Sequence, residues 1–409
     1  MKTLLLLFLL VFQINTCQQS NGITTQSTQI KTDINDSDII VGAERIALYH
    51  PLLEGKKVAC VVNHTSMVGK MHLVDTLLQL DVNIIRLFSP EHGFRGEADA
   101  GEKVSDNIDS KTQLPVISLY GNHKKPTTED LKDVDIVLFD LQDVGVRFYT
   151  YISTLSYVME ACAERGIPLI VLDRPNPHMN YLDGPVLDPK FSSFVGLHPV
   201  PVVYGMTIGE YATMVNEESW LKNEVKCELN IIPCKNLYRN SYYKIPISPS
   251  PNLPNMKSIL LYPSLCFFEP TVVSVGRGTD HQFQQIGYPD YKNHGYSFTP
   301  MPNRGAKDPK YNGKMCYGEY LGDQTLGALN DAHQLNLNWL YQYYQNSELH
   351  EQFFTNPEFF DKLAGTDELR KQLLDGKSID EIKRSWRAGL ENFKPLRFKY
   401  LMYQIEDEE

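Results

Sequence analysis

Short apolar runs alternate with amphipathic stretches between residues 57 and 234. The runs cover residues 57–62, 83–88, 116–120, 135–141, 169–172 and 229–232. Their continuous apolar character is typical of strands that are covered on both faces of a parallel sheet. Between them, Ile152, Leu155, Met159 and Cys162 recur at helical spacing. The alternation predicts an α/β fold, in which helices flank a parallel sheet.

Capping signals locate two helix starts. Thr207 stands three residues before Glu210, which predicts a helix over residues 207–221 with Glu210 in a capping role. Ser378 and Glu381 have the same spacing and predict a helix over residues 378–393. Helical patterns also cover residues 325–345 and 367–374, and residues 271–275 resemble a strand.

Prolines change the character of the chain after about residue 244. We expect the segment that they punctuate not to form a regular helix, because proline lacks an N–H donor and clashes with the preceding turn. These prolines are Pro246, Pro249, Pro251, Pro254 and Pro263. The change places a domain boundary between residues 245 and 246.

The N-terminus carries a segment that we expect to lie outside the fold. Lys2 precedes an apolar run over residues 4–12, which is too short for a membrane span and indicates a signal peptide over residues 1–17. Cys17 stands where a lipoprotein signal would be cleaved and acylated, so lipidation and ordinary secretion both stay open. Residues 18–36 are rich in Ser, Thr, Gln and Asn, which predicts a disordered tether.

Composition and charge narrow the classes of partner. With 42% hydrophobic residues the chain can bury a core, and its net charge of −11 argues against nucleic acid as a partner. No CxxC pair occurs, and neither a cofactor nor a metal requirement is indicated. Cys60, Cys162 and Cys266 lie in apolar runs as expected core residues, whereas a disulfide between Cys227 and Cys234 stays open.

Polar residues follow the predicted strands. Ligands of open parallel sheets bind beyond the carboxyl ends of the strands, where loops present polar groups without disturbing the core. Four loops therefore predict one pocket at this edge. Their polar residues are Asn63, His64, Thr65 and Ser66; Ser89, Glu91 and His92; Asp140, Gln142, Asp143 and Arg147; and Asp173, Arg174 and Asn176.

Several kinds of chemistry lack their motifs. GxSxG and HExxH are absent, and the glycine that a phosphate-binding loop needs before Gly376 is Lys371. Gly276 and Gly278 form GxG, but His281 replaces the third glycine of a dinucleotide fingerprint. Carboxylate acid/base chemistry remains, which is the usual equipment for cleaving glycosidic bonds.

Four separated motifs resemble the signature stretches of a known family. They are SPEHGFRG at residues 89–96, DLQDVGVRFY at 140–149, DRPNP at 173–177 and SVGRGTD at 274–280. The chain is similar to the exo-β-N-acetylmuramidase family, which is also known as DUF1343 and as a glycoside hydrolase family. The resemblance runs from about residue 41 to the closing KPLRFKYLMY at residues 394–403.

The resemblance implies an enzyme that removes β-1,4-linked N-acetylmuramic acid from the non-reducing end of peptidoglycan fragments, in cell-wall recycling. It implies a Rossmann-like catalytic domain over residues 37–245 and a smaller α+β domain over residues 246–409 that closes a cleft. Its partners would be peptidoglycan-derived saccharides or muropeptides, with membrane contact only through a lipid on Cys17. We expect a bacterial protein that is exported to the periplasm or anchored at the cell envelope.

Five residues are candidates for catalysis. Glu91 is the first choice for the acid because it directly follows a strand. Asp143 and Glu269 are candidates for a second carboxylate, with structural hydrogen bonding or a proline-fixed loop as their alternatives. His64 and His92 are expected to polarise water or a substrate hydroxyl unless they are merely structural.

Arginines bear on specificity, because N-acetylmuramic acid differs from N-acetylglucosamine by a lactyl ether whose carboxylate a guanidinium can bind. Arg147, Arg174 and Arg277 are the candidates, and Arg277 stands between two glycines. Bracing of a loop is the alternative for Arg174, and a domain-bridging salt bridge is the alternative for Arg277. The other candidate substrate-binding residues are Asn63, Ser66, Gln142, Tyr149 and Asn176.

Two other functions stay open. A non-catalytic peptidoglycan-binding lipoprotein would bind muropeptides in the same cleft without turnover. An exo-β-N-acetylglucosaminidase on the same scaffold would not require the lactyl carboxylate, and replacing Arg277 would then be harmless.

Overall fold

The computed structural model describes residues 39–91, 93–94, 107–292 and 295–405. The expected signal peptide, the tether and Cys17 lie outside the described residues, and so does His92. The predicted domain boundary at residues 245 and 246 stays a prediction.

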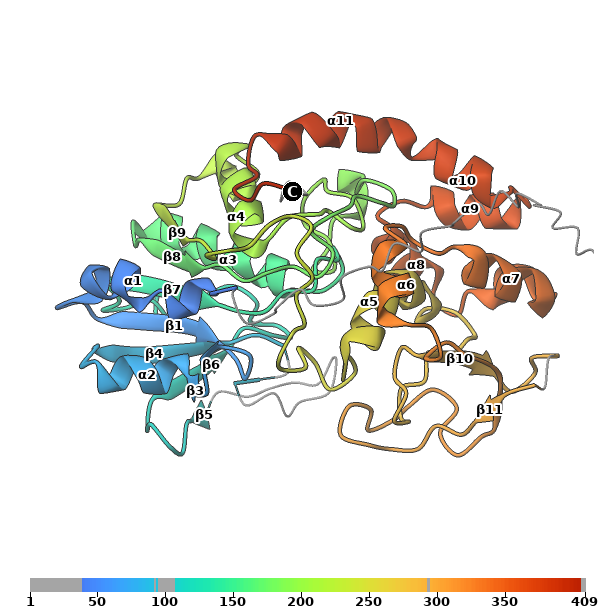
Figure 1. Cartoon of the computed structure of the whole chain (residues 1–409), viewed down its shortest axis with the longest axis horizontal. Helices are drawn as coiled ribbons and strands as arrows, with labels where there is room; N and C mark the ends of the chain where they lie inside the picture. The colour runs from blue at the N-terminus through green and yellow to red at the C-terminus, as the bar shows by residue number, and fades with distance from the viewer. Residues whose placement is uncertain (1–38, 92, 95–106, 293–294, 406–409) are drawn as a thin grey trace, which may run out of the picture. The chain divides into compact units, whose positions relative to one another are not determined.

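A seven-stranded sheet forms the centre of the N-terminal half of the described chain (Figure 1). The strands follow the order β5-β6-β4-β1-β7-β8-β9, and every neighbouring pair is parallel except β5 with β6. The strands are β1 (Val58–Val62), β4 (Ile84–Ser89), β5 (Asn107–Ile108), β6 (Pro115–Ser118), β7 (Ile136–Asp140), β8 (Leu169–Leu172) and β9 (Leu229–Ile232). All six predicted strands are confirmed. The short antiparallel β5 is an addition, because two exposed residues carry no apolar pattern.

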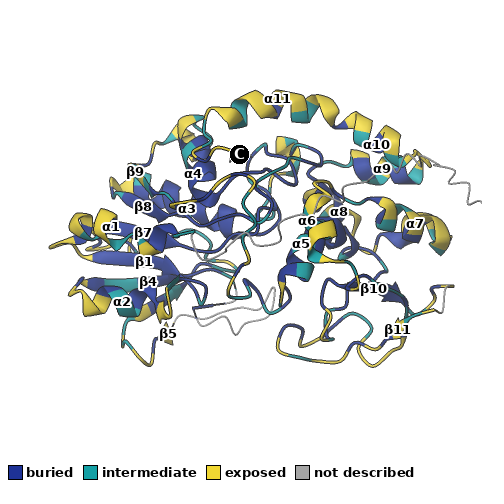
Figure 2. Cartoon of the chain, in the orientation of Figure 1, coloured by how far each residue is buried: buried dark blue, intermediate teal, exposed yellow. Residues whose placement is uncertain are grey.

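Both faces of the sheet are covered, as the apolar runs predicted. Alternate residues of β1 point to opposite faces: Ala59 and Val61 pack into one apolar cluster with residues of α3 and α4, and Val58 and Cys60 pack into another with residues of α1 and α2. The bounds are α1 (Ile46–Leu53), α2 (Leu73–Gln79), α3 (Tyr151–Arg165) and α4 (Ile208–Glu217). Figure 2 shows the central strands as buried. The structure is therefore a doubly covered α/β sheet with a second, C-terminal α+β part.

Short elements connect these layers. They are the 3₁₀ turns η2 (Gly42–Glu44), η3 (Pro189–Phe191) and η4 (Lys222–Glu224), and the hairpin of β2 (Met67–Val68) and β3 (Met71–His72).

Helices surround a small antiparallel sheet in the C-terminal half. The sheet has the order β10-β12-β11 and consists of β10 (Gln285–Tyr288), β11 (Ser297–Phe298) and β12 (Cys316–Tyr320). The helices are α5 (Met256–Leu265), η5 (Cys266–Phe268), α6 (Leu326–Asp331), α7 (Asn338–Ser347), η6 (His350–Phe353), α8 (Pro357–Ala364), α9 (Glu368–Leu374), α10 (Ile379–Ser385) and α11 (Arg387–Phe398).

The end of the chain returns to the N-terminal half. Arg397 at the end of α11 donates to the carbonyls of Gly205 and Met179. The hydroxyl of Tyr403 donates to Asp173 at 2.5 Å, just beyond β8. The last described residues thus pack against the parallel sheet, and Figure 1 shows α11 leading towards α4.

The capping predictions are confirmed at both sites. The hydroxyl of Thr207 accepts a hydrogen bond from the N–H of Glu210, and Glu210 accepts one from the N–H of Thr207. Ser378 and Glu381 repeat this box at the start of α10.

Four predictions for the C-terminal half are wrong in detail. Residues 271–275 form no strand, because Thr271 bridges to Phe354 whereas Ser274 bridges to Gly287, and no ladder develops. Residues 325–345 form two helices, since the loop between α6 and α7 buries Leu335 and Leu337 instead of continuing the helix. The helix from Ser378 breaks at Trp386.

The fourth concerns Pro263, which lies inside α5, within the segment expected not to be helical. Its ring is buried near the helix end, where burial outweighs a lost backbone hydrogen bond.

The six described cysteines are free thiols and all are buried. Cys60, Cys162 and Cys266 are core residues as predicted. Cys227 and Cys234, whose pairing the sequence left open, are unpaired. No helix among the described residues is long and apolar enough to span a membrane.

Candidate active site

Two residues of the loop after β1 are folded into the protein instead of lining a cavity. Asn63 and Ser66 are fully buried. The Asn63 amide donates to the hydroxyl of Tyr151 at 2.7 Å and accepts from the N–H of Thr65, and Ser66 donates to the carbonyl of Asp140 at 2.5 Å. Both predicted binding residues therefore fix the loop.

Arg174 braces a neighbouring loop, which was the alternative reading of this residue. Its guanidinium donates to both carboxylate oxygens of buried Asp140, at 2.5 and 2.8 Å, and also to the carbonyl of Met67. Burial alone would lower the pKa of Arg174, but the charge of Asp140 outweighs burial and raises it.

Gln142 and Asn176 are buried in the same layer. The amide of Gln142 donates to the carbonyls of Asp143 and Pro175, and the amide of Asn176 donates to the carbonyl of Met206. Gly145 has a φ of +73°, and a Cβ there would lie 1.9 Å from the Asn176 amide oxygen. Only glycine fits this close approach.

Asp143 is a buried carboxyl in the loop that follows β7 and is not among the residues that line the pocket described below. It accepts hydrogen bonds from the N–H of Gly145 and the hydroxyl of Tyr204, while its Oδ1 has no partner among the described residues. Burial raises the pKa of Asp143 to about 6, although these hydrogen bonds act in the opposite direction.

Arg147 is fully buried and ties the two halves together. Its guanidinium donates to the carbonyls of Pro185 and Val200 in one half, and to those of Leu363 and Ala364 at the end of α8 in the other. Burial lowers the pKa of Arg147 to about 9. The structure places it among backbone carbonyls and not on a pocket wall.

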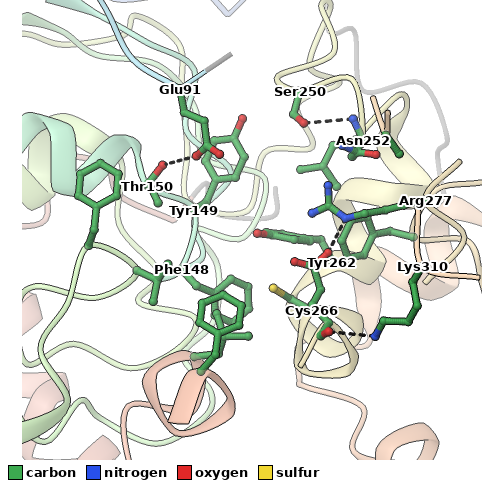
Figure 3. Close-up of a pocket in the computed structure, with 18 of the residues that line it drawn as sticks. Glu91, Phe148, Tyr149, Thr150, Ser250, Asn252, Tyr262, Cys266, Arg277 and Lys310 are labelled. Carbon is green, nitrogen blue, oxygen red and sulfur yellow. Dashed lines mark hydrogen bonds and ion pairs between the residues drawn. The ribbon is translucent and has the colours of Figure 1, made fainter. Parts of the chain in front are cut away.

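A pocket of about 410 Å³ lies where residues of the two halves meet. It brings together four of the predicted site residues, namely Glu91, Tyr149, Glu269 and Arg277. Figure 3 shows Glu91 on one wall and Arg277 on the opposite wall, with Tyr149 and Tyr262 between them.

Glu91 follows β4 and is held by the start of α3. The hydroxyl of Thr150 donates to Glu91 Oε2 at 3.0 Å. Thr150 is the N-cap of α3, so the carboxylate lies near the positive end of a helix. Tyr149 anchors the same wall by donating from its hydroxyl to the carbonyl of Pro249 at 2.8 Å.

Arg277 reaches the pocket from a turn that two glycines shape. Gly276 and Gly278 have φ values of +78° and +81°, and a Cβ on Gly278 would meet Pro309 at 2.6 Å. Arg277 Nε donates to Glu269 Oε1 at 2.5 Å, and the guanidinium lies over the ring of Phe283. No described residue accepts from its terminal nitrogens, which face the cavity in Figure 3.

Charge on this wall is balanced by Glu269. Burial alone would lower the pKa of Arg277, but the pair with Glu269 outweighs burial and raises it. Lys310 lies beside the pair and donates to the carbonyls of Glu269 and Val273. Burial lowers the pKa of Lys310 to about 8. The wall therefore presents a fixed guanidinium next to an amine whose pKa is lowered by burial.

His64 lies outside this pocket. Its Nε2 is 2.8 Å from the carbonyl of Ser248, and it lines a second pocket of about 450 Å³. His92 lies outside the described residues.

Several pocket residues were not predicted from the sequence. Thr150 directly follows the DLQDVGVRFY motif, which is the signal that could have identified it. The others lie in proline-rich loops or, in the case of Tyr262, in α5, and their pattern gives no sign of a common site. They are Ser250, Asn252, Tyr262, Asp308 and Lys310.

Comparisons with known proteins agree along nearly the whole chain. Residues 58–257 match the N-terminal domain of the family described as exo-β-N-acetylmuramidase NamZ, and residues 260–403 match its C-terminal domain. The peptidoglycan β-N-acetylmuramidase NamZ of Bacillus subtilis (strain 168) is 38% identical over 392 residues, which cover 87% of this chain and 89% of that protein.

Two solved structures of DUF1343 family proteins from Bacteroides fragilis NCTC 9343 share the fold. One has a TM-score of 0.84 and 46% identity, covering 90% of this chain and all of that one. The other has a TM-score of 0.75 and 28% identity, covering 90% of this chain and 99% of that one. The family resemblance of the four motifs is thereby confirmed, and the chain belongs to the exo-β-N-acetylmuramidase NamZ family.

Proposed function

We propose that this protein is a glycoside hydrolase that removes β-1,4-linked N-acetylmuramic acid from the non-reducing end of peptidoglycan fragments. Family membership supports the reaction, and the B. subtilis relative is named for this activity. The observation that carries the proposal is the pocket in which Glu91 faces Arg277 (Figure 3).

Glu91 is the residue that we assign as the general acid. Cleavage of a glycosidic bond requires a carboxyl group that protonates the leaving oxygen. Two candidate catalytic carboxyls line the pocket, namely Glu91 and Glu269. Glu269 is paired with Arg277, whereas one oxygen of Glu91 is held by the hydroxyl of Thr150. A held carboxyl lowers the entropy cost of reaching the glycosidic oxygen.

Arg277 is the residue that we assign to the lactyl carboxylate. Its Nε is engaged by Glu269, so the guanidinium is held in one orientation and its terminal nitrogens can grip a substrate carboxylate. Glu269 thus acts by positioning the guanidinium. We assign Asp143 to holding the loop that follows β7, through its bonds to Gly145 and Tyr204.

The volume and lining of the pocket suit a single sugar residue. Its volume is at the small end of the roughly 300–1,000 Å³ that is typical of ligand pockets. Apolar side chains of Phe148, Phe359 and Leu363 line it, and Figure 3 places Phe148 away from the end at which Ser250 and Asn252 lie.

The test compares the 4-nitrophenyl β-glycosides of N-acetylmuramic acid and N-acetylglucosamine as substrates of the wild-type protein. We expect kcat/KM to be at least about tenfold higher for the muramic acid compound, since hydrogen bonds to a charged group contribute about 1.5–3 kcal/mol. Equal hydrolysis would favour an N-acetylglucosaminidase. Binding of muropeptides without any turnover would favour a non-catalytic binding protein.

Export to the cell envelope is a further part of the proposal. The apolar run at residues 4–12 and Cys17 support a cleaved signal, with a lipid anchor as one outcome. Labelling of the full chain with radioactive palmitate in a bacterial host, with Cys17→Ala as the control, separates the outcomes. Label that is lost in the variant supports anchoring, and unlabelled protein in the extracytoplasmic fraction supports secretion. Retention of both proteins in the cytoplasm would contradict export.

A further inference from the structure

Two more pockets continue from the candidate active site. The second, of about 450 Å³, shares Ser250 with the first, and the third, of about 440 Å³, shares Asp280 and Asn303 with the second. The first pocket, which contains Glu91, therefore neighbours the second, and the second neighbours the third.

Hydrogen bonds hold together the loops that line the first and second pockets. The amide of Asn252 donates to the carbonyl of Gly305 at 2.6 Å, which links residues that line both pockets. The hydroxyl of Tyr149 donates to the carbonyl of Pro249, next to Ser250. This bond joins the wall that carries Glu91 to a loop that lines both pockets.

One residue that lines the second pocket has a buried acceptor without a partner. Gln282 is 7% exposed and lines this pocket, and no described residue donates to its Oε1. An unpaired buried amide oxygen costs about 1–3 kcal/mol unless a ligand or water satisfies it. The acetamido N–H of an amino sugar is a donor of the required kind.

The third pocket offers an aromatic surface. Tyr296 is half-buried, and its hydroxyl donates to Gln285 at 2.6 Å, while Gln285 donates to the hydroxyl of Thr279. These bonds hold the tyrosine ring in place at low entropic cost. Sugar rings pack against such faces through their C–H groups.

We propose that the second and third pockets bind the glycan on the reducing side of the cleaved bond. An N-acetylglucosamine occupies the second pocket with its acetamido group at Gln282, and the next N-acetylmuramic acid packs on Tyr296 in the third. This inference rests on the proposed function and extends it, because it makes a β-1,4-linked chain of three or more sugars the preferred substrate.

The test measures KM for three peptide-free substrates with the same terminal sugar: the 4-nitrophenyl glycoside, the disaccharide and the tetrasaccharide. We expect KM to fall at each step for the wild-type protein. Gln282→Leu should raise KM roughly three- to tenfold for the disaccharide and the tetrasaccharide without lowering stability, since it removes an unpaired group. Tyr296→Ala should raise KM for the tetrasaccharide alone.

Tyr341→Ala is the matched control, because Tyr341 is a half-buried tyrosine of α7 outside the three pockets. Equal KM values for all three substrates would overturn the proposal. A gain in affinity that appears only when stem peptides are attached would also overturn it, in favour of a peptide site.

Failure of the proposed function is distinguishable from failure of this inference. If the nitrophenyl glycoside is not hydrolysed, calorimetric binding of the tetrasaccharide still tests whether the second and third pockets bind the glycan. Binding that is weakened by Tyr296→Ala but not by Tyr341→Ala would support glycan binding in these pockets. Absence of binding would overturn the proposal.

Discussion

Individual side chains divide the predicted site residues into two groups with different physical roles. Glu91, Tyr149, Glu269 and Arg277 line one pocket. The second group consists of buried polar groups that satisfy one another or the backbone, namely Asn63, Ser66, Gln142, Asp143, Arg147, Arg174 and Asn176. The sequence does not separate Glu91 and Tyr149 from the second group, because a motif does not state which way a side chain points.

Arg277→Ala tests recognition of the lactyl carboxylate. We expect KM for the muramic acid glycoside to rise about 10- to 100-fold while kcat falls much less, because hydrogen bonds to a charged group contribute about 1.5–3 kcal/mol in ground and transition state alike. Steady-state kinetics on both chromogenic glycosides provide the measurement. An unchanged KM for the muramic acid compound would remove Arg277 from substrate binding.

Asp143→Asn tests the buried carboxyl by linkage. Its pKa in the folded protein is raised from 3.8 to about 6, so the folded state binds a proton that the unfolded state releases between those values. The stabilisation is fully present below about pH 4 and is lost as pH rises through about 6. Urea unfolding should therefore show the wild type losing up to about 3 kcal/mol relative to the variant over this window. A wild type that gains stability relative to the variant as pH rises would contradict the assignment.

Helix starts are the elements that the sequence predicted best, because a capping box is a local pattern. Thr207 and Ser378 both head such boxes. The helix over residues 325–345 failed for the opposite reason, since its interruption depends on the burial of Leu335 and on a hydrogen bond from its N–H to distant Asp183. Tertiary contacts of this kind leave no trace in the local pattern.

Thr207→Ala and Ser378→Ala form a matched pair of cap deletions. Ser378→Ala should cost about 1 kcal/mol, as for an exposed N-cap. Thr207→Ala should cost about 2–3 kcal/mol, because the buried Thr207 hydroxyl also donates to Asp173 at 2.8 Å. Denaturant midpoints at constant m-value provide the comparison. Equal losses would mean that the bond to Asp173 contributes nothing.

The whole molecule depends on contacts that join its two halves around the pocket. The apolar runs of the sequence predicted the sheet. Arg147 and the carbonyl groups of α8 that it binds, however, lie more than 200 positions apart along the chain. These bonds also place Leu363 on the pocket wall. No local signal predicts such a pairing. The cleft was predicted from the family resemblance and not from the periodicity of the sequence.

Arg147→Lys tests these bonds. One ammonium cannot replace a planar guanidinium that bonds four carbonyls, so we expect a loss of about 3 kcal/mol or more in the free energy of unfolding. The exposed Arg165→Lys serves as the control. If Arg147→Lys had the stability of the wild type and a raised KM, Arg147 would instead be a substrate-binding residue.

The most direct test of the central claim is the turnover of the N-acetylmuramic acid–N-acetylglucosamine disaccharide by Glu91→Gln. A sugar leaving group must be protonated, whereas nitrophenolate departs as an anion, so we expect kcat for the disaccharide to fall by about 10²- to 10⁴-fold and kcat for the nitrophenyl glycoside to fall far less. Glu129→Gln, on a largely exposed glutamate, is the matched control and should leave both rates unchanged. Disaccharide turnover by Glu91→Gln within about threefold of the wild-type rate would contradict Glu91 as the general acid.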